Sequence, residues 1–199
     1  MRFFMFLLSF MGIGYGENTV VANPTYQQAV FSMGCFWCAE SEFRDHKTSN
    51  PLPGIISIRV GYAGGTIPNP TYKSHEGYKE AVKITFDPTQ ITYNQLLNIF
   101  WHNIDPFNEK GQFCDVGPQY SSAIYFNDEQ QKMEATNTKE AIQKTLSKGD
   151  ILTEIIAYTS FYDAEDDHQN YKQKNPKKYS FYRSGCHRDK RLTELWLSQ

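Results

Sequence analysis

A short apolar run that ends in glycine and cysteine constrains the fold of this chain more than any other segment. Residues 29–33 are almost wholly apolar, and Gly34 and Cys35 follow at once. An apolar run bounded by glycine is typical of a buried β-strand. Residues 36–46 are helix formers with a charged face. The segment therefore predicts a strand, a tight junction that carries Cys35, and a helix that begins directly after it.

The rest of the chain alternates between strand-like and helix-like patterns. Strands are predicted at 55–62, 81–86, 121–126 and 153–158, and helices after Thr92, from Asn127 or Asp128 to about Ser147, and at 164–174. The order β-α-β-β-α-β is that of a ferredoxin-like split unit, with an added helix and strand. We therefore expect an α+β fold: a ferredoxin-like sandwich on a mixed sheet, with additional helices and a long irregular C-terminal tail from Asn175.

The first residues form a segment of their own. Residues 3–13 are apolar except for Ser9 and Gly12, a single Arg2 precedes them, and Gly14-Tyr15-Gly16 offers small residues before Glu17. This pattern is typical of a secretory signal, and the run is too short to span a bilayer as an ordinary helix. We expect residues 1–16 to be a signal peptide and the protein to be exported, either periplasmic or secreted. The alternative is a buried N-terminal helix.

Length and charge limit the functions open to the rest of the chain. A chain of 199 residues suits a single domain, here 17–199, and can bury a sizeable core without disulfides or metal. Its 20 basic and 22 acidic residues give a formal charge of −2. No basic field exists that would attract nucleic acid or anionic lipid. We therefore expect no nucleic-acid partner.

Cys35 has the setting of a reactive thiol. A cysteine at the start of a helix lies in the positive field of the helix N-terminus, which favours the thiolate, and the thiolate is the nucleophile. Phe36 and Trp37 come next and could form an apolar pocket that suits a thioether methyl group. On composition alone, the two rings are equally consistent with core residues.

The segment Gly34-Cys35-Phe36-Trp37-Cys38-Ala39-Glu40 resembles the signature of the peptide methionine sulfoxide reductase A family. Further segments match the family in its own order, and the resemblance covers nearly everything from Val30 to Trp196. These segments are Gly61-Tyr62-Ala63-Gly64-Gly65, Pro68-Asn69-Pro70-Thr71-Tyr72, Phe86-Asp87-Pro88, Asp115-Val116-Gly117-Pro118-Gln119-Tyr120-Ser121-Ser122-Ala123-Ile124-Tyr125 and Ala164-Glu165-Asp166-Asp167-His168-Gln169.

The resemblance implies reduction of methionine S-sulfoxide, free or within oxidised proteins and peptides, to methionine. Cys35 would attack the sulfoxide sulfur and become a sulfenic acid. Glu80 would protonate the sulfoxide oxygen, with Glu76 as the alternative acid. Tyr72 and Tyr120 would hydrogen-bond that oxygen, and Asp115 would organise the network.

The remaining implied roles are substrate binding, packing and recycling. Phe36 and Trp37 would bind the substrate, and we interpret His168 as a packing residue. A second thiol must then condense with the Cys35 sulfenic acid, and an external thioredoxin-like dithiol must reduce the resulting disulfide.

Three other cysteines could resolve the sulfenic acid: Cys38, Cys114 and Cys186. We favour Cys186 over Cys38, because a Cys35–Cys38 bond would distort the first helical turn. A buried structural thiol is the simplest interpretation of Cys114. We expect no bound cofactor or metal, and a monomer.

Three other classes of protein compete with this hypothesis. A thioredoxin-like disulfide oxidoreductase could use Cys35 and Cys38 as a Cys-x-x-Cys pair. A zinc-binding module is disfavoured because Cys114 and Cys186 form no second close pair. A secreted structural protein with two disulfides is the third.

Overall fold

The computed structural model describes residues 25–44, 52–146 and 148–196. The predicted signal peptide, residues 1–16, lies outside the described residues. The elements follow one another in this order: β1 (Gln27–Ser32), α1 (Phe36–Arg44), β2 (Ile55–Ala63), β3 (Lys79–Phe86), α2 (Tyr93–Trp101), β4 (Gly111–Gln112), β5 (Asp115–Val116), η1 (Pro118–Tyr120), β6 (Ala123–Phe126), α3 (Glu129–Leu146), β7 (Glu154–Ala157), β8 (Phe161–Asp163), η2 (Asp166–His168), α4 (Tyr171–Lys174), α5 (Pro176–Gly185) and α6 (Arg188–Trp196).

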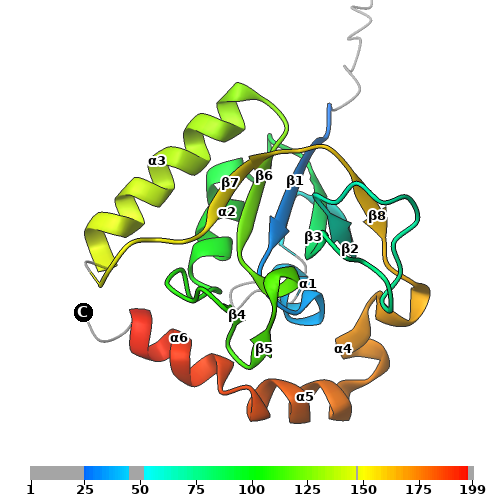
Figure 1. Ribbon diagram of the computed structural model, residues 1–199. Helices are drawn as coiled ribbons and strands as arrows, with labels where there is room; N and C mark the ends of the chain where they lie inside the picture. The colour runs from blue at the N-terminus through cyan, green and yellow to red at the C-terminus, as the bar shows by residue number, and fades with distance from the viewer. Residues whose placement is uncertain (1–24, 45–51, 147, 197–199) are drawn as a thin grey trace, which may run out of the picture.

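The main sheet has six strands in the order β7-β6-β1-β3-β2-β8. Neighbouring strands are antiparallel except β6 and β7, which are parallel. The α+β class and the mixed sheet are therefore confirmed. β4 and β5 form a separate small hairpin, which lies between the main sheet and the C-terminal helices in Figure 1.

Helices cover one face of the sheet, and the larger buried cluster fills the space between these helices and that face. Alternate residues of β1 point to opposite faces, as the period of a strand requires. Phe31 contacts Phe43 of α1, with ring centroids 5.7 Å apart, and Phe100 of α2, with centroids 5.2 Å apart. Val30 belongs instead to a smaller cluster on the other face, which also contains Tyr125. This core holds the end of β1, and with it Cys35, in a fixed position.

Local capping explains where two predicted helices begin. The Thr92 side chain accepts from the Gln95 N–H, and the Gln95 side chain accepts from the Thr92 N–H, so α2 starts with a capping box. At α3, Asp128 Oδ1 accepts from the Gln131 N–H at 2.8 Å. Both predicted N-termini are confirmed.

The expected irregular C-terminal tail is wrong. The chain forms α5 and α6, which run below the ends of the central strands in Figure 1. Pro176 occupies the first turn of α5, where its missing N–H costs nothing. Distant partners stabilise this part: Arg183 donates to Glu42 of α1 at 2.5 Å, and the buried Arg188 donates to the Asn103 carbonyl. Contacts between residues so far apart in sequence cannot be predicted from the local sequence pattern.

The segment before this tail also differs from the prediction. The helix expected at 164–174 is reduced to the short helices η2 and α4. The strand β8, which was not predicted, pairs with the edge of β2. Within the described residues, no helix has the length and apolar character that crossing a bilayer requires.

Candidate active site

Cys35 lies at the junction between β1 and α1, as predicted. Its carbonyl accepts hydrogen bonds from the N–H groups of Cys38 and Ala39, each at 3.1 Å, so it caps the helix. Gly34 before it has a φ of +79°, and a Cβ there would lie 2.6 Å from Cβ of the buried Gln112. Only glycine adopts this positive φ without strain and also leaves room for the Gln112 side chain. The junction therefore presents Cys35 in one fixed orientation.

Glu80 lies opposite this junction on β3. Its carboxyl oxygen Oε2 accepts from the Phe36 N–H at 2.9 Å, and its side chain is only 1% exposed. Burial raises the pKa of Glu80 to about 8, although the Phe36 N–H acts in the opposite direction. Glu80 is therefore a carboxyl group that keeps its proton at neutral pH, directly beside Cys35.

One small cavity, of about 40 Å³, collects the residues that the sequence singled out. It is lined by Cys35, Phe36, Trp37, Tyr72, Glu80, Asp115, Tyr120 and Tyr182. The first seven are the predicted catalytic and substrate-binding residues, and six separate positions along the chain contribute to the lining. Tyr182 of α5 is an addition that sequence reasoning missed. Its best local signal was its position four residues before Cys186 in the tail.

An aromatic wall holds Trp37 on one side of this cavity. The Trp37 ring stacks on Tyr171, with centroids 3.6 Å apart, and meets Tyr182 edge-on at 5.9 Å. Its indole N–H donates to Nδ1 of His168 at 3.1 Å. Burial lowers the pKa of His168, which keeps Nδ1 free to accept. These contacts agree with our interpretation of His168 as a packing residue.

The loop that carries Tyr72 is attached to the same wall. The Tyr72 N–H donates to Glu165 Oε1 at 2.9 Å, and the Tyr62 hydroxyl donates to Glu165 Oε2 at 2.9 Å. The Tyr72 ring also stacks on His168, with centroids 4.4 Å apart. Burial raises the pKa of both Tyr72 and Tyr120. Both phenols are therefore neutral hydrogen-bond donors at physiological pH.

The electrostatic prediction for Cys35 is wrong in direction. Burial raises its pKa well above the ordinary value, and the neighbouring Cys38 and Glu80 raise it further. The N-terminus of α1 does not compensate, because its Phe36 N–H already donates to Glu80. Cys38 behaves oppositely: a hydrogen bond from Cys35, assisted by Arg188 and Arg183, lowers the pKa of Cys38 to about 7 against the effect of burial. Cys38 is thus the more readily ionised thiol of the pair.

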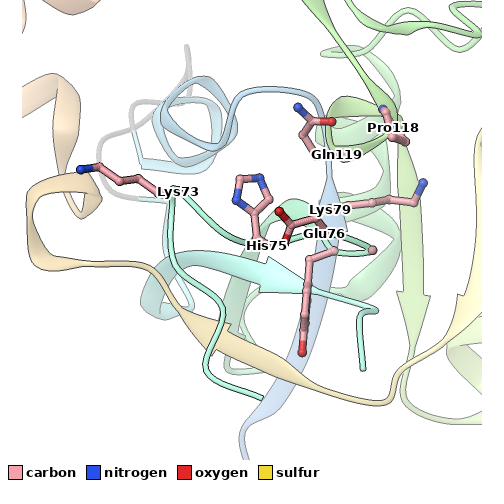
Figure 2. A pocket seen from close by; sticks show the side chains of 8 residues that line it. Lys73, His75, Glu76, Lys79, Pro118 and Gln119 are labelled. Carbon is pink, nitrogen blue, oxygen red and sulfur yellow. The ribbon is translucent and has the colours of Figure 1, made fainter. Parts of the chain in front are cut away.

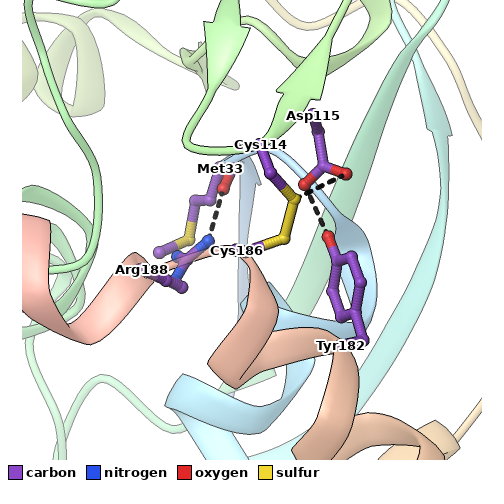
Figure 3. The surroundings of a disulfide bond; sticks show 6 residues. All are labelled: Met33, Cys114, Asp115, Tyr182, Cys186 and Arg188. Atoms are coloured by element: carbon purple, nitrogen blue, oxygen red, sulfur yellow. Dashed lines mark hydrogen bonds between the residues drawn. A yellow bond between two sulfur atoms is a disulfide. The ribbon is translucent and has the colours of Figure 1, made fainter.

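Cys186 is bonded to Cys114 and not to Cys35. The Cα atoms of this disulfide are 4.8 Å apart, and it joins two segments 72 residues apart in sequence (Figure 3). The interpretation of Cys114 as a buried thiol is therefore wrong, and Cys114 is exposed. Cys35 and Cys38 are both free. The tertiary structure decides this pairing, since it brings the end of α5 against the β4–β5 hairpin.

The disulfide also bears on metal binding. Among the described residues, Cys114, Asp115 and Cys186 place their ligand atoms within 4.8 Å of one another. The two sulfurs are bonded to each other, however, and metal ions bind cysteine as the thiolate. This cluster is therefore not a metal site in the oxidised state.

A second cavity, of about 380 Å³, is lined in part by the alternative acid, Glu76 (Figure 2). Glu76 is fully exposed there, and hydrogen bonds from its own backbone N–H and from Ser74 lower its pKa. A carboxyl group in this setting is ionised at neutral pH and has no proton to donate. The geometry therefore favours Glu80 over Glu76 as the acid.

Comparisons with known proteins match most of this chain. Residues 27–199 match the family described as peptide methionine sulfoxide reductase. A peptide methionine sulfoxide reductase MsrA 2 from Caulobacter vibrioides is 38% identical over 180 residues, which are 88% of this chain and 88% of that protein. The solved structure of methionine sulfoxide reductase A of Corynebacterium diphtheriae has a TM-score of 0.66 and 31% identity, and covers 78% of this chain and 77% of that one.

A second solved structure shares the fold at lower similarity. It is Mxr1 from Saccharomyces cerevisiae in complex with Trx2, with a TM-score of 0.53 and 22% identity. The match covers 77% of this chain and 91% of that one.

Proposed function

The chain belongs to the peptide methionine sulfoxide reductase A family, and from that premise we propose that Cys35 is the nucleophile by which it reduces methionine S-sulfoxide to methionine. The observation that carries this assignment is the single cavity in which Cys35 meets a buried, protonated Glu80 and two neutral tyrosines. That set of groups suits a substrate whose sulfur is attacked while its oxygen must be protonated.

The first step transfers the sulfoxide oxygen from the substrate sulfur to the sulfur of Cys35. Cys35 gives up its proton, and its sulfur forms a bond with the sulfoxide sulfur while Glu80 protonates the oxygen. The oxygen then passes to Cys35 as the bond between substrate sulfur and oxygen breaks. Methionine leaves, and Cys35 is left as a sulfenic acid. Tyr72 and Tyr120 hydrogen-bond the oxygen during this transfer, and Phe36 with Trp37 holds the methyl group.

Cys38 is the thiol best placed to resolve the sulfenic acid. It is buried beside Cys35, and its lowered pKa gives a substantial thiolate population near neutral pH. The Cys38 thiolate attacks the Cys35 sulfenic sulfur, a disulfide forms, and hydroxide leaves with a proton as water. This assignment replaces our sequence-based preference for Cys186 at this step, and it accepts the distortion of the first turn of α1 that a Cys35–Cys38 bond requires.

We propose that the Cys114–Cys186 pair, here called the exit pair, takes over the disulfide from Cys35 and Cys38 and passes it to the external reductant. Cys35 and Cys38 are only 6% and 2% exposed, so the thiolate of a protein reductant cannot approach their disulfide along the S–S axis. Cys114, in contrast, is exposed. The thiolate of Cys186 attacks the buried disulfide, and Cys114 then attacks Cys186 to release it. We propose that a thioredoxin-like dithiol reduces the final disulfide; the yeast relative solved with Trx2 supports that class of partner.

Replacing Cys114 by serine should separate chemistry from recycling. We expect the variant to form methionine in its first turnover at a rate within about threefold of the wild type. Its steady-state rate with a thioredoxin-like reductant should fall at least about tenfold, because the accessible disulfide no longer forms. Rapid-quench counting of methionine, with mass mapping of the disulfides, measures both quantities.

The small dithiol dithiothreitol supplies the control for this variant, since it depends less on surface access than a protein does. Partial rescue of the serine variant by dithiothreitol is expected. An unchanged steady-state rate with the protein reductant would show that the exit pair is not on the recycling route.

We also propose that the protein is exported. The apolar run at 3–13 and the small residues Gly14-Tyr15-Gly16 support this proposal, and disulfides persist in oxidising compartments. Sequencing the mature N-terminus is the test. A chain that begins near Glu17 is expected, and a mature chain that retains Met1 would contradict export by a cleaved signal.

A further inference from the structure

Tyr182, Cys35 and Asp115 line the same small cavity, and the Tyr182 hydroxyl contacts the Asp115 carboxyl group. It lies 2.5 Å from Asp115 Oδ2, and Figure 3 shows the phenol pointing at that carboxylate. The phenol is the donor in this bond, because an ionised carboxylate only accepts. The hydroxyl also lines the cavity beside Cys35, and its hydrogen bond with that thiol lowers the pKa of Cys35. One phenol thus links the reacting sulfur to a proton acceptor.

Building on the proposed function, we propose that Tyr182 is a further catalytic residue, which transfers the proton of the Cys35 thiol to Asp115 as Cys35 attacks the sulfoxide. The thiol proton moves to the phenol oxygen while the phenol's own proton moves to the Asp115 carboxylate. The sulfur keeps its electron pair for the bond to the substrate. Glu80 protonates the sulfoxide oxygen from the other side, and solvent later returns the proton from Asp115 to Glu80.

The site needs such an acceptor because its other groups are poorly suited to the task. Glu80 holds its own proton and cannot take another, and the phenols of Tyr72 and Tyr120 are neutral groups that serve the proposed reaction as donors. Cys38 is the competing acceptor, since it is in contact with Cys35. Burial raises the pKa of Asp115, which makes its carboxylate a better proton acceptor than an exposed one.

The fold holds Tyr182 firmly enough for a relay. Its ring packs edge-on against Trp37. The next residue, Arg183, donates to Glu42 and Asp189, and Cys186 ties the end of α5 to Cys114. A hydroxyl that is held in place before the substrate arrives loses little entropy in the transition state. Tyr182 therefore has the fixed geometry that proton transfer requires.

Tyr182→Phe removes the hydroxyl and keeps the ring against Trp37. We expect the first-turnover rate to fall about 100-fold, the lower range for loss of a positioned acid–base group. We also expect the pH midpoint of Cys35 alkylation by iodoacetamide to move to higher pH, because the thiolate loses a hydrogen bond. Mass mapping of the alkylated peptides separates Cys35 from Cys38.

Tyr93→Phe is the matched control. It removes a buried tyrosine hydroxyl that has no partner and lies on α2, away from the cavity. We expect an unchanged rate and an unchanged Cys35 midpoint in this variant. Repeating Tyr182→Phe in a Cys38→Ser background tests the competing acceptor: the same loss of rate supports Tyr182, and disappearance of the loss assigns the role to Cys38.

Asp115→Asn and the double variant complete a cycle that does not depend on one substitution. If Tyr182 and Asp115 act as one unit, the two losses in rate are strongly non-additive. Additive losses, or a Tyr182→Phe enzyme with wild-type rate and midpoint, would overturn the relay. Failure of the wild-type enzyme to form methionine would instead overturn the proposed function, so the two outcomes are distinct.

Discussion

Cys35→Ser should abolish the reduction of methionine S-sulfoxide, with a fall in rate of at least about 10⁴-fold, the scale of nucleophile removal in other enzymes. A serine hydroxyl is a weak nucleophile toward sulfur, and accepting the sulfoxide oxygen would require an unstable oxygen–oxygen bond. The side chains are nearly isosteric, so the junction between β1 and α1 should fold normally. An epimer-resolved assay with dithiothreitol measures the loss.

First-turnover counting gives this prediction its sharpest form. The Cys38→Ser, Cys114→Ser and Cys186→Ser variants should each form about one methionine per enzyme, because Cys35 still attacks. Only Cys35→Ser should form none. Near-ultraviolet circular dichroism checks that the aromatic wall around Trp37 is intact in every variant. Methionine formation by Cys35→Ser at the wild-type rate would exclude Cys35 as the nucleophile.

Glu80→Gln should lower the first-turnover rate by about 10²- to 10⁴-fold, the usual contribution of a positioned general acid. The glutamine oxygen can still accept from the Phe36 N–H, so the variant loses the proton and keeps the contact. Glu76→Gln is the matched control, because that carboxyl group is exposed and already ionised. Comparable activity of Glu80→Gln and Glu76→Gln would refute the assignment.

The pH profile provides a second readout for Glu80. General acid catalysis needs the protonated carboxyl group, which predominates below the pKa of about 8. The first-turnover rate of the wild type should therefore decline as the pH rises through about 8. In Glu80→Gln this descending limb should be absent. A limb at the same pH in both proteins would assign it to another group.

Burial favours the role of Glu80 as the acid but opposes the role of Cys35 as the nucleophile. It raises the pKa of Glu80, which keeps the acid protonated, and it also raises the pKa of Cys35, which disfavours the thiolate. A dry cavity therefore suits the proton donor and impedes the nucleophile. The Tyr182–Asp115 pair offers a route by which the thiol proton can leave without exposing the cavity to water.

Much of the site could be predicted because its signals are local. The junction at Gly34 and Cys35 needs only a strand that ends, a positive φ and a helix that begins, and neighbouring residues encode all three. The same holds for the capping box of Thr92. Glu80 and Asp115 were identified through the family resemblance, and the fold then placed both in one cavity with Cys35.

The sequence by itself determined the order of the central strands and helices, the position of Cys35 at a helix start and the family to which the chain belongs. Only the tertiary structure decided the pairing of Cys114 with Cys186, the helical tail that brings Tyr182 to the cavity, and the direction in which the pKa of Cys35 moves. The physical reason is the separation in sequence between the residues that interact. Strand period and helix caps depend on adjacent residues, whereas burial and partners such as Arg183 and Glu42, 141 residues apart, exist only after the chain has folded.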